Sequence, residues 1–301
     1  MITEITLFKH NEPLCKHTSF RVGGPADFYI CPDKENFVEQ AVFTLKTAQN
    51  EKIALFTLGG GANVLAADSG FRGIVLDTTA FSGCRILETK NGVELACFAG
   101  TKSDDAAEFA LENSFGNIEF LAGLPGTIGG AVWMNARCYE SSVSDFLGDV
   151  LIINEEFKTE TIEFKANDYA YKKSPYQTRP VLILEARFRV KKENRLIIEQ
   201  KMREYRADRE AKGHFSWPSA GSVFKNNHDF GKPTGKIIEA LGLRGTQIGG
   251  ARIADWHGNF IINTGNASAS DIHSLISLIT IEAKKKLGIT LEPEIIFLGN
   301  D

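Results

Sequence analysis

Two glycine-rich clusters in this sequence have the residue types of ligand-binding backbone. The first, Gly59–Leu65, reads GGGANVL and directly follows the apolar segment Ile53–Thr57. Backbone without side chains approaches a ligand closely, and successive N–H groups form a concave nest that suits an anion such as pyrophosphate. Val64 stands where the motif G-x-G-x-x-G has its third glycine, so a Rossmann fold is excluded. A structural turn without a ligand explains this cluster alone equally well.

The second cluster, Gly123–Ala131, reads GLPGTIGGA. It combines two turn-forming dipeptides, a hydroxyl and a pair of glycines, which is more than a simple loop requires. The combination suits backbone laid against a flat ligand, with Thr127 supplying a hydrogen bond. A tight structural turn is an equally good interpretation of this stretch taken alone.

A third cluster, Pro218–Asn226, brings two hydroxyls close in sequence to a cation. Ser219 and Ser222 precede Lys225. A serine in such a loop is more often only a turn former.

Other motifs for phosphate or metal chemistry fail on spacing. Gly231–Lys236 is one residue short of the phosphate loop G-x-x-x-x-G-K-[ST], and Ile237 replaces the hydroxyl residue. The six histidines lack H-E-x-x-H spacing and the five cysteines include no C-x-x-C pair. We therefore expect no bound metal and no disulfide framework, and the pattern gives no support to a Ser-His-Asp arrangement.

The overall composition is that of a globular chain with an acidic balance. Lys and Arg number 34 against 38 for Asp and Glu, the formal net charge is −4, and 43% of the 301 residues are hydrophobic. Binding to nucleic acid or to a membrane surface would need a basic face, so we expect neither partner. No apolar run approaches the roughly 18 residues of a membrane-spanning helix. Met1–Ile5 lacks the start of a signal peptide, so we expect a cytoplasmic protein.

Apolar runs predict strands, and amphipathic spacing predicts helices between them. The expected strands are Asp27–Cys31, Ile53–Thr57, Ile74–Asp77, Val93–Phe98, Val150–Ile153, Val181–Val190 and Asn259–Asn263. The expected helices are one capped by Asp33 with Phe37, Ala41 and Leu45 on one face, one capped by Ser103, and those at Leu196–Lys212, Thr234–Leu241 and Ser270 to a stop at Gly288. Because strands and helices do not alternate strictly, the pattern favours an α+β fold.

Six segments, taken in order, carry a resemblance to one family. They are Thr18–Ala26, Gly59–Leu65, Gly123–Asn135, Ala220–Asn226, Gln247–Ala251 and Leu291–Glu294. Each motif alone is weak, but six in sequence from about residue 17 to 298 make chance a poor explanation. The chain resembles the UDP-N-acetylenolpyruvoylglucosamine reductases (the MurB family), and its length resembles that of their shorter type II members.

The resemblance implies a flavoenzyme of peptidoglycan precursor synthesis. NADPH would reduce bound FAD, and hydride would pass to the enolpyruvyl group of UDP-N-acetylglucosamine enolpyruvate, giving UDP-N-acetylmuramate. It also implies an FAD-binding domain of the oxidase (PCMH) type over residues 1–204, with lobes at about 1–75 and 76–204. A smaller α+β substrate-binding domain would cover 205–301, with the last strand returning to the FAD-binding domain. We expect the protein to be a monomer.

The same resemblance assigns site residues. FAD would be held by Gly59, Gly60, Gly61, Asn63, Val64, Gly123, Pro125, Gly126, Thr127 and Gly130. The substrate would contact Tyr139, Tyr171, Lys225 and Asn226. Ser222 would donate a proton to the enolate-like centre, and Glu294 would share a proton with the enolate oxygens. Glu292 is of the same type and two residues away, so the choice of Glu294 depends on motif alignment alone.

The sequence departs from the family pattern at a catalytic position. Lys172 stands where the family has an arginine, and lysine keeps the charge but loses the planar fork that grips a carboxylate. Three interpretations are open: Lys172 substitutes with weaker stabilisation, Lys173 takes the role through a change of register, or the site is impaired. We favour the first.

A second departure lies in the loop after Met134. Arg137 and Glu140 replace two glycines of the family pattern, so positive φ is less accessible and a different loop conformation is expected. Arg137 can alternatively supply the missing guanidinium, or form an outward-facing surface pair with Glu140.

Two other functions are open at the level of the sequence. A flavin-linked oxidase of small alcohols or hydroxy acids on the same fold accounts for the first two clusters but not for Ser222, Tyr171 and Glu294. A nucleotide-sugar-binding homologue that lost catalysis through the change at Lys172 is the non-enzymatic alternative.

Overall fold

The computed structural model describes residues 7–90 and 92–300, so the expected lack of a leader at Met1–Ile5 lies outside the described residues. The chain divides into two compact units. Unit 1 comprises Met1–Tyr29, Gly61–Ile74 and Arg209–Asp301, and unit 2 comprises Ile30–Gly60 and Val75–Asp208. These two compact units do not coincide with the predicted FAD-binding domain (1–204) and substrate-binding domain (205–301). The boundary between those two domains stays a prediction.

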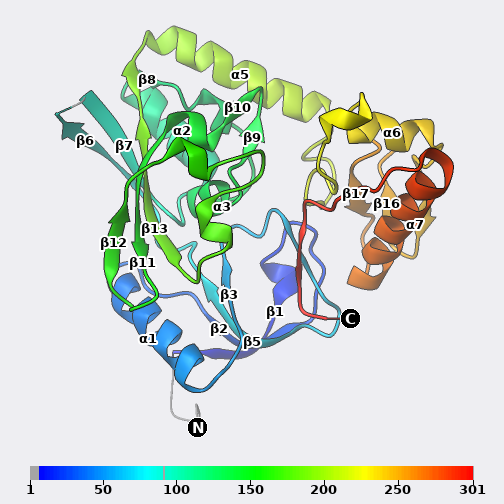
Figure 1. Cartoon of the computed structure of the whole chain (residues 1–301), viewed down its shortest axis with the longest axis horizontal. Helices are drawn as coiled ribbons and strands as arrows, with labels where there is room; N and C mark the ends of the chain where they lie inside the picture. The colour runs from blue at the N-terminus through cyan, green and yellow to red at the C-terminus, as the bar shows by residue number, and fades with distance from the viewer. Residues whose placement is uncertain (1–6, 91, 301) are drawn as a thin grey trace. The chain divides into compact units, whose positions relative to one another are not determined.

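Unit 2 is built on a five-stranded antiparallel sheet in the order β12-β11-β13-β7-β6 (Figure 1). The strands are β6 (Cys84–Thr89), β7 (Gly92–Phe98), β11 (Leu147–Ile153), β12 (Thr159–Ile162) and β13 (Leu182–Arg189). The central strand β13 is buried without interruption from Leu182 to Ala186, as expected of a strand covered on both faces.

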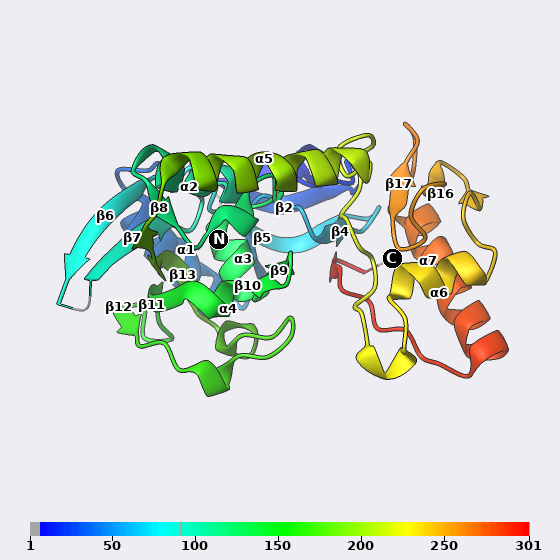
Figure 2. The same cartoon turned by 90° about the horizontal axis from the view of Figure 1, so that it is seen from above.

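Helices and short strands complete unit 2. They are α1 (Phe37–Asn50), β3 (Leu55–Leu58), α2 (Ser103–Glu112), β8 (Phe115–Gly116), α3 (Ile128–Trp133), β9 (Arg137–Cys138), β10 (Ser141–Ser142), α4 (Val143–Phe146), β14 (Lys191–Lys192) and most of α5 (Arg195–Ala211). Helix α5 runs along α2 (Figure 2). Arg206 of α5 bonds Asp104 at 2.7 Å and Glu108 at 2.5 Å, which joins the polar sides of the two helices.

Unit 1 gathers three separate parts of the chain. Strands β1 (Lys9–Pro13) and β2 (Pro25–Ile30) pair antiparallel, and β5 (Phe71–Asp77) follows β2 before continuing into unit 2. The strands β4 (Val64–Ala66) and β18 (Ile296–Leu298) pair in parallel. Helix α7 (Ala269–Leu287) packs against β16 (Ala251–Ile253) in the sheet β15-β16-β17 (Figure 1), whose other strands are β15 (Gln247–Ile248) and β17 (Ile261–Asn263). Helix α6 (Thr234–Ala240) completes the unit.

All seven expected strands overlap observed ones, and the mixed content confirms the α+β class. Helix α7 has the expected buried face and ends at Gly288, whose φ of 71° is left-handed. Helices α5 and α6 also lie where they were expected.

Both predicted N-caps were wrong by position. Helix α1 is preceded by Asn36, because Asp33 is engaged with Gln40 through two hydrogen bonds of 3.0 and 3.3 Å. The buried face of α1 contains Thr44 rather than Leu45. Lys102 occupies the N-cap position of helix α2, and Ser103 is the first residue of the helix itself.

Candidate functional site

The two glycine clusters meet within unit 2. Gly59 and Gly60 follow strand β3, and a Cβ placed on Gly59 would lie 2.4 Å from the Thr127 Oγ1 atom. A Cβ on Gly60 would lie 2.8 Å from the Gly126 Cα atom. Such distances admit no side chain, so the first two glycines are required by the close approach of the second cluster.

The second cluster is held in place by backbone hydrogen bonds to the connection between strand β7 and helix α2 and to the first residue of α2. The Ile128 N–H donates to the Thr101 carbonyl at 2.8 Å, and the Ser103 N–H donates to the Gly126 carbonyl at 3.1 Å. Gly126 has a φ of 101°, which only glycine adopts readily. The loop is therefore rigidly built, and Thr127 stands at the start of α3.

The Thr127 hydroxyl is buried, and within residues 7–90 and 92–300 it has no hydrogen-bond partner. It does not cap α3. Leaving a buried hydroxyl unpaired is costly, commonly by about 1–3 kcal/mol. An unpaired hydroxyl beside side-chain-free backbone fits a polar group such as the diphosphate of a dinucleotide. Pro125 and Gly130 lie exposed beside it, and Gly123 has a positive φ of 66°.

The remainder of the first cluster belongs to unit 1. Gly61 has a φ of 61°, and a Cβ there would lie 2.0 Å from the His17 carbonyl oxygen. The Asn63 side chain donates to the Glu294 carbonyl at 2.9 Å, and Val64 pairs with Ile296 in the parallel ladder. Within unit 1 the structure therefore brings Asn63, predicted to hold the cofactor, beside Glu294, predicted to act on the substrate.

The segment 222–225 lies between two other extended segments of unit 1. On one side Ser222 forms an isolated bridge with Phe260, and on the other Phe224 forms one with Pro293. The Glu294 N–H donates to the Val223 carbonyl at 2.7 Å. This pairing places the predicted proton donor, Ser222, next to the chain segment that carries Glu294.

The two candidate glutamates have different surroundings. Glu292 is 70% exposed and its carboxylate accepts a 2.5 Å ion pair from the Lys225 ammonium. Glu294 is half-buried, and its backbone N–H and carbonyl are both hydrogen-bonded. Glu292 is thus paired with Lys225, and the choice of Glu294 as the acting glutamate stays a prediction. Asn226 is exposed and accepts a bond from the Thr234 N–H at 2.9 Å.

The remaining predicted residues belong to unit 2. Tyr139 stacks on Tyr205 at a centroid distance of 4.1 Å, and its hydroxyl donates to the Tyr205 carbonyl at 2.8 Å. Tyr171 is 40% exposed and Lys172 is half-buried. Lys172 has a φ of 57°, and its carbonyl accepts from the Gln177 amide at 3.1 Å.

The expected loss of positive φ after Met134 was wrong at one of the two positions. Glu140 adopts a φ of 65°, and its neighbour Tyr139 a φ of 49°. Arg137 lies instead in the extended strand β9, paired with Ser142 of β10. The Tyr139 ring packed on Tyr205 is an anchor for the left-handed backbone, which a non-glycine residue adopts only at a cost.

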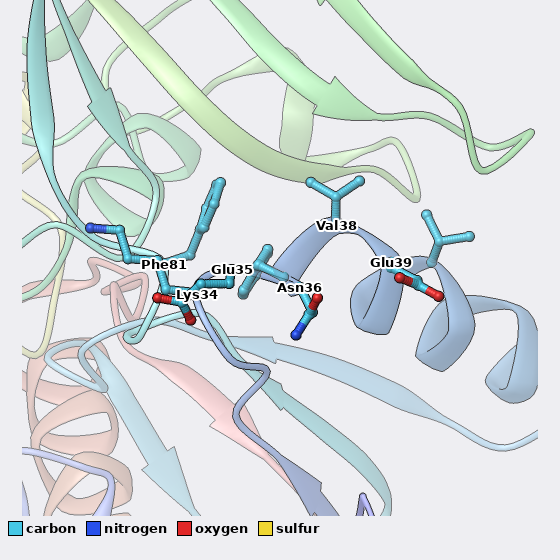
Figure 3. A pocket seen from close by; sticks show the side chains of 8 residues that line it. Lys34, Glu35, Asn36, Val38, Glu39 and Phe81 are labelled. Carbon is cyan, nitrogen blue, oxygen red and sulfur yellow. The ribbon is translucent and has the colours of Figure 1, made fainter.

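Residues 7–90 and 92–300 contain no group of three His, Cys, Asp or Glu side chains placed to hold a metal ion, and all five cysteines are free thiols. In the same residues no helix is long and apolar enough to cross a bilayer. A hollow of about 480 Å³ lies at the first turn of α1 (Figure 3). It is lined by Lys34–Glu39, Val42 and Phe81, none of which was predicted as a site residue.

Sequence reasoning missed one buried polar residue that is hydrogen-bonded to segment 222–225 from another part of the chain. Asn259 is 3% exposed and is hydrogen-bonded to the main chain of Phe224. The only signal in the sequence was an amide at the start of an otherwise apolar strand, Asn259–Asn263.

Comparisons with known proteins agree on one family. Residues 213–298 match the C-terminal domain of UDP-N-acetylenolpyruvoylglucosamine reductase, and residues 26–156 match an FAD binding domain. The chain is 43% identical to a reductase of that name from Treponema denticola, over 96% of this chain and 93% of the relative, and 39% identical to one from Borreliella burgdorferi, over 99% and 97%.

A solved structure of the reductase from Thermus caldophilus is 26% identical, with a TM-score of 0.80 over 97% of this chain and 100% of that one. The relatives and the domain matches together cover both units described above. This chain belongs to the UDP-N-acetylenolpyruvoylglucosamine reductase family.

Proposed function

We propose that this chain reduces UDP-N-acetylglucosamine enolpyruvate to UDP-N-acetylmuramate, with FAD as its bound cofactor and NADPH as the reductant. The family membership supports the reaction. The observation that carries the proposal is the backbone pairing of residues 222–225 with 292–294, because it places the segment of Ser222 and Lys225 directly beside the segment of Glu292 and Glu294 in unit 1.

The residues of the two glycine clusters fit the cofactor. The Thr127 hydroxyl is buried with no partner among the described residues, and Gly59 and Gly60 leave the adjacent backbone bare. We assign the diphosphate of FAD to these groups. When bound, FAD supplies the hydride transfer that no amino-acid side chain can perform.

The proton is supplied by Ser222. Addition of hydride to the enolpyruvyl group leaves an enolate-like centre that must be protonated. Among the described residues none hydrogen-bonds the Ser222 hydroxyl, so its proton is available to the substrate. Lys225, three residues on, is paired with the Glu292 carboxylate at 2.5 Å, and we assign it to the substrate contacts.

Glu294 and Lys172 act on the carboxylate end of the substrate. Glu294 shares a proton with the enolate oxygens, and the Lys172 ammonium replaces the family's guanidinium as the stabilising cation. Tyr139, Tyr171 and Asn226 complete the substrate contacts. We further propose that the protein acts as a cytoplasmic monomer.

The test is an anaerobic titration of the two half-reactions. We expect the purified protein to be yellow, to be bleached by NADPH, and to regain its colour when UDP-N-acetylglucosamine enolpyruvate is added. The Ser222→Ala variant should be bleached at the wild-type rate and re-oxidised about 10²–10⁴-fold more slowly.

The other outcomes identify the alternatives. Bleaching without re-oxidation would favour a protein that only binds the nucleotide sugar. Re-oxidation by small alcohol-derived carbonyl compounds instead would indicate a different flavoenzyme. A colourless protein that cannot be loaded with FAD would overturn all the flavoenzyme assignments.

A further inference from the structure

We infer that Asn259 is a positioning residue that sets the orientation of the Ser222 hydroxyl, an inference that rests on the proposed function. Its side-chain amide bonds both main-chain groups of Phe224. The Phe224 N–H donates to Asn259 Oδ1 at 2.9 Å, and Asn259 Nδ2 donates to the Phe224 carbonyl at 2.8 Å. The amide thus takes the place of a peptide group from a neighbouring strand.

The main chain of Asn259 extends the same interaction toward Ser222. Its carbonyl accepts from the Val223 N–H at 2.9 Å. Its own N–H donates to His257 Nδ1 at 3.1 Å, so the Nδ1 nitrogen of His257 is an acceptor. Burial lowers the pKa of His257, which favours the neutral ring that this bond requires. One residue therefore makes three bonds to the two residues that follow Ser222.

Apart from the bridge between Ser222 and Phe260, no side chain among the described residues gives the chain before Ser222 comparable support. Gly221 has a φ of 69°, and a Cβ built on it would meet no described atom within 4 Å. The hydroxyl itself has no hydrogen-bond partner among the described residues. The position of Ser222 Oγ is therefore determined by the backbone at Val223 and Phe224, and that backbone is fixed on one edge by Asn259.

The opposite edge of the segment is fixed independently. The Lys225 N–H donates to the Glu292 carbonyl at 2.9 Å, and the Glu294 N–H donates to the Val223 carbonyl. Loss of the Asn259 side-chain amide would keep the bond from the Val223 N–H to the Asn259 main-chain carbonyl, but it would release both main-chain groups of Phe224. The segment could then shift by a small distance next to Ser222. Displacement of a reacting group by about 1 Å is enough to cost about 100-fold in rate.

A double-mutant cycle between Asn259→Ala and Ser222→Ala tests the inference. We expect Asn259→Ala to leave bleaching by NADPH within about twofold and to slow re-oxidation by the enolpyruvyl substrate about 10–100-fold. If Asn259 acts through Ser222, the double variant should be no slower than Ser222→Ala alone. Multiplicative losses would overturn the inference, because the two residues would then act separately.

Asn263→Ala is the matched control. Asn263 is also a buried amide of the same segment, 5% exposed, but it bonds the Phe20 carbonyl and the N–H groups of Gly265 and Ala267. We expect it to lower thermal stability about as much as Asn259→Ala while re-oxidation stays within about twofold. An equal loss of re-oxidation in both variants would overturn the inference in favour of general destabilisation.

Hydrogen exchange gives a readout that does not depend on catalysis. The Phe224 amide, which loses its Asn259 side-chain acceptor, should exchange faster in Asn259→Ala and at the wild-type rate in Asn263→Ala, whereas the Val223 amide keeps its main-chain acceptor and is an internal reference. If Asn259→Ala does not fold, Asn259→Asp keeps the acceptor for the Phe224 N–H but loses the donor to the Phe224 carbonyl. The Phe224 amide should then stay protected while re-oxidation by the enolpyruvyl substrate still slows. Unchanged exchange of the Phe224 amide in Asn259→Ala would overturn the inference.

The two proposals fail differently in this experiment. A wild-type protein that is not re-oxidised by the enolpyruvyl substrate overturns the proposed function itself. A wild-type protein that is re-oxidised, combined with independent losses in the cycle, overturns only the role of Asn259.

Discussion

Lys172 combines two unusual properties in a single residue. It stands where the family carries an arginine, and its backbone has a left-handed φ of 57° in a half-buried turn. Its carbonyl is held by Gln177, and the nearby Ala170 carbonyl accepts from the Asn135 amide at 2.9 Å. The turn is thus attached to the end of helix α3, which supports a defined place for the Lys172 side chain.

We expect Lys172→Ala to lower kcat about 10²–10³-fold, the usual cost of removing one group that stabilises developing charge. Lys172→Arg should stay within about tenfold of wild type, since the charge is retained. Steady-state kinetics with saturating NADPH measure both variants.

Lys173→Ala is the matched control and should change kcat less than twofold. A large loss of kcat in Lys173→Ala would favour a shifted register. A loss of turnover confined to Arg137→Ala would instead assign the stabilising cation to Arg137. Unchanged turnover in both Lys172 variants would exclude Lys172 from that role.

Residue types could be read from the sequence more readily than residue roles. The sequence predicted Ser222 and Glu294 as site residues, but it gave no sign that Glu292 is paired with Lys225. That ion pair forms only when segments 67 residues apart pair. Asn259 was missed for the same reason, because its function is visible only in its bonds to Phe224.

The start of helix α7 shows how an element is stabilised from outside its own sequence. Ser268 and Asp271 form a capping box, and Asp68 accepts from the Ala269 N–H at 2.7 Å and the Ser270 N–H at 2.9 Å. Burial alone would raise the pKa of Asp68, but the hydrogen bonds from Ser270 and Ala269 outweigh it and hold that pKa below its usual value of 3.8. Bonds from Ser268 and Gly250 lower the pKa of Asp271 in the same way.

This arrangement predicts a loss of stability in acid. Because the folded-state pKa of Asp68 is depressed, its contribution is present above the unfolded value of about 3.9 and disappears as pH falls through the folded value. We expect Asp68→Asn to reduce the free energy of unfolding by about 1 kcal/mol at pH 7, and this difference should shrink as the pH is lowered toward 3. Urea titrations at several pH values measure it.

The control for this prediction is Asp229→Asn, which removes the same charge from a carboxylate in a short turn of the same unit. It should change the free energy of unfolding by less than about 0.5 kcal/mol at every pH. A difference between Asp68→Asn and wild type that persists unchanged at pH 3 would show that the charge of Asp68 does not support the helix.

Elements with a strong period or a distinct apolar run could be predicted, whereas several of the shortest elements could not. The buried face of α7 and the runs that form β7 and β13 are visible as apolar spacing. Strands β4 and β18 each have three residues, which is too short for a period to appear. The predicted N-caps at Asp33 and Ser103 were wrong because Asp33 is hydrogen-bonded to Gln40 and Ser103 is a buried residue of the helix itself. Neither feature can be seen in the few residues around a cap.

At the scale of the whole chain, the pairing of β18 with β4 closes unit 1. The Ile296 N–H donates to the Asn63 carbonyl at 2.8 Å. Ile296→Pro removes this donor and should reduce the free energy of unfolding by about 1–3 kcal/mol more than Ile296→Ala, which shortens the side chain but keeps the N–H. Equal losses in the two variants, measured by urea denaturation, would show that the pairing contributes little.

The composition of unit 1 from three chain segments has a consequence for synthesis on the ribosome. Unit 2 is complete in sequence at Asp208, whereas β4 lacks its partner until residues 296–298 have been made. At the usual rate of about 5–20 residues per second, the intervening 90 residues occupy about 5–18 s. Throughout that interval the nascent chain carries an unpaired apolar strand edge, a feature prone to wrong pairing. We expect newly made chains to depend on chaperone protection most strongly in this window, before β18 emerges.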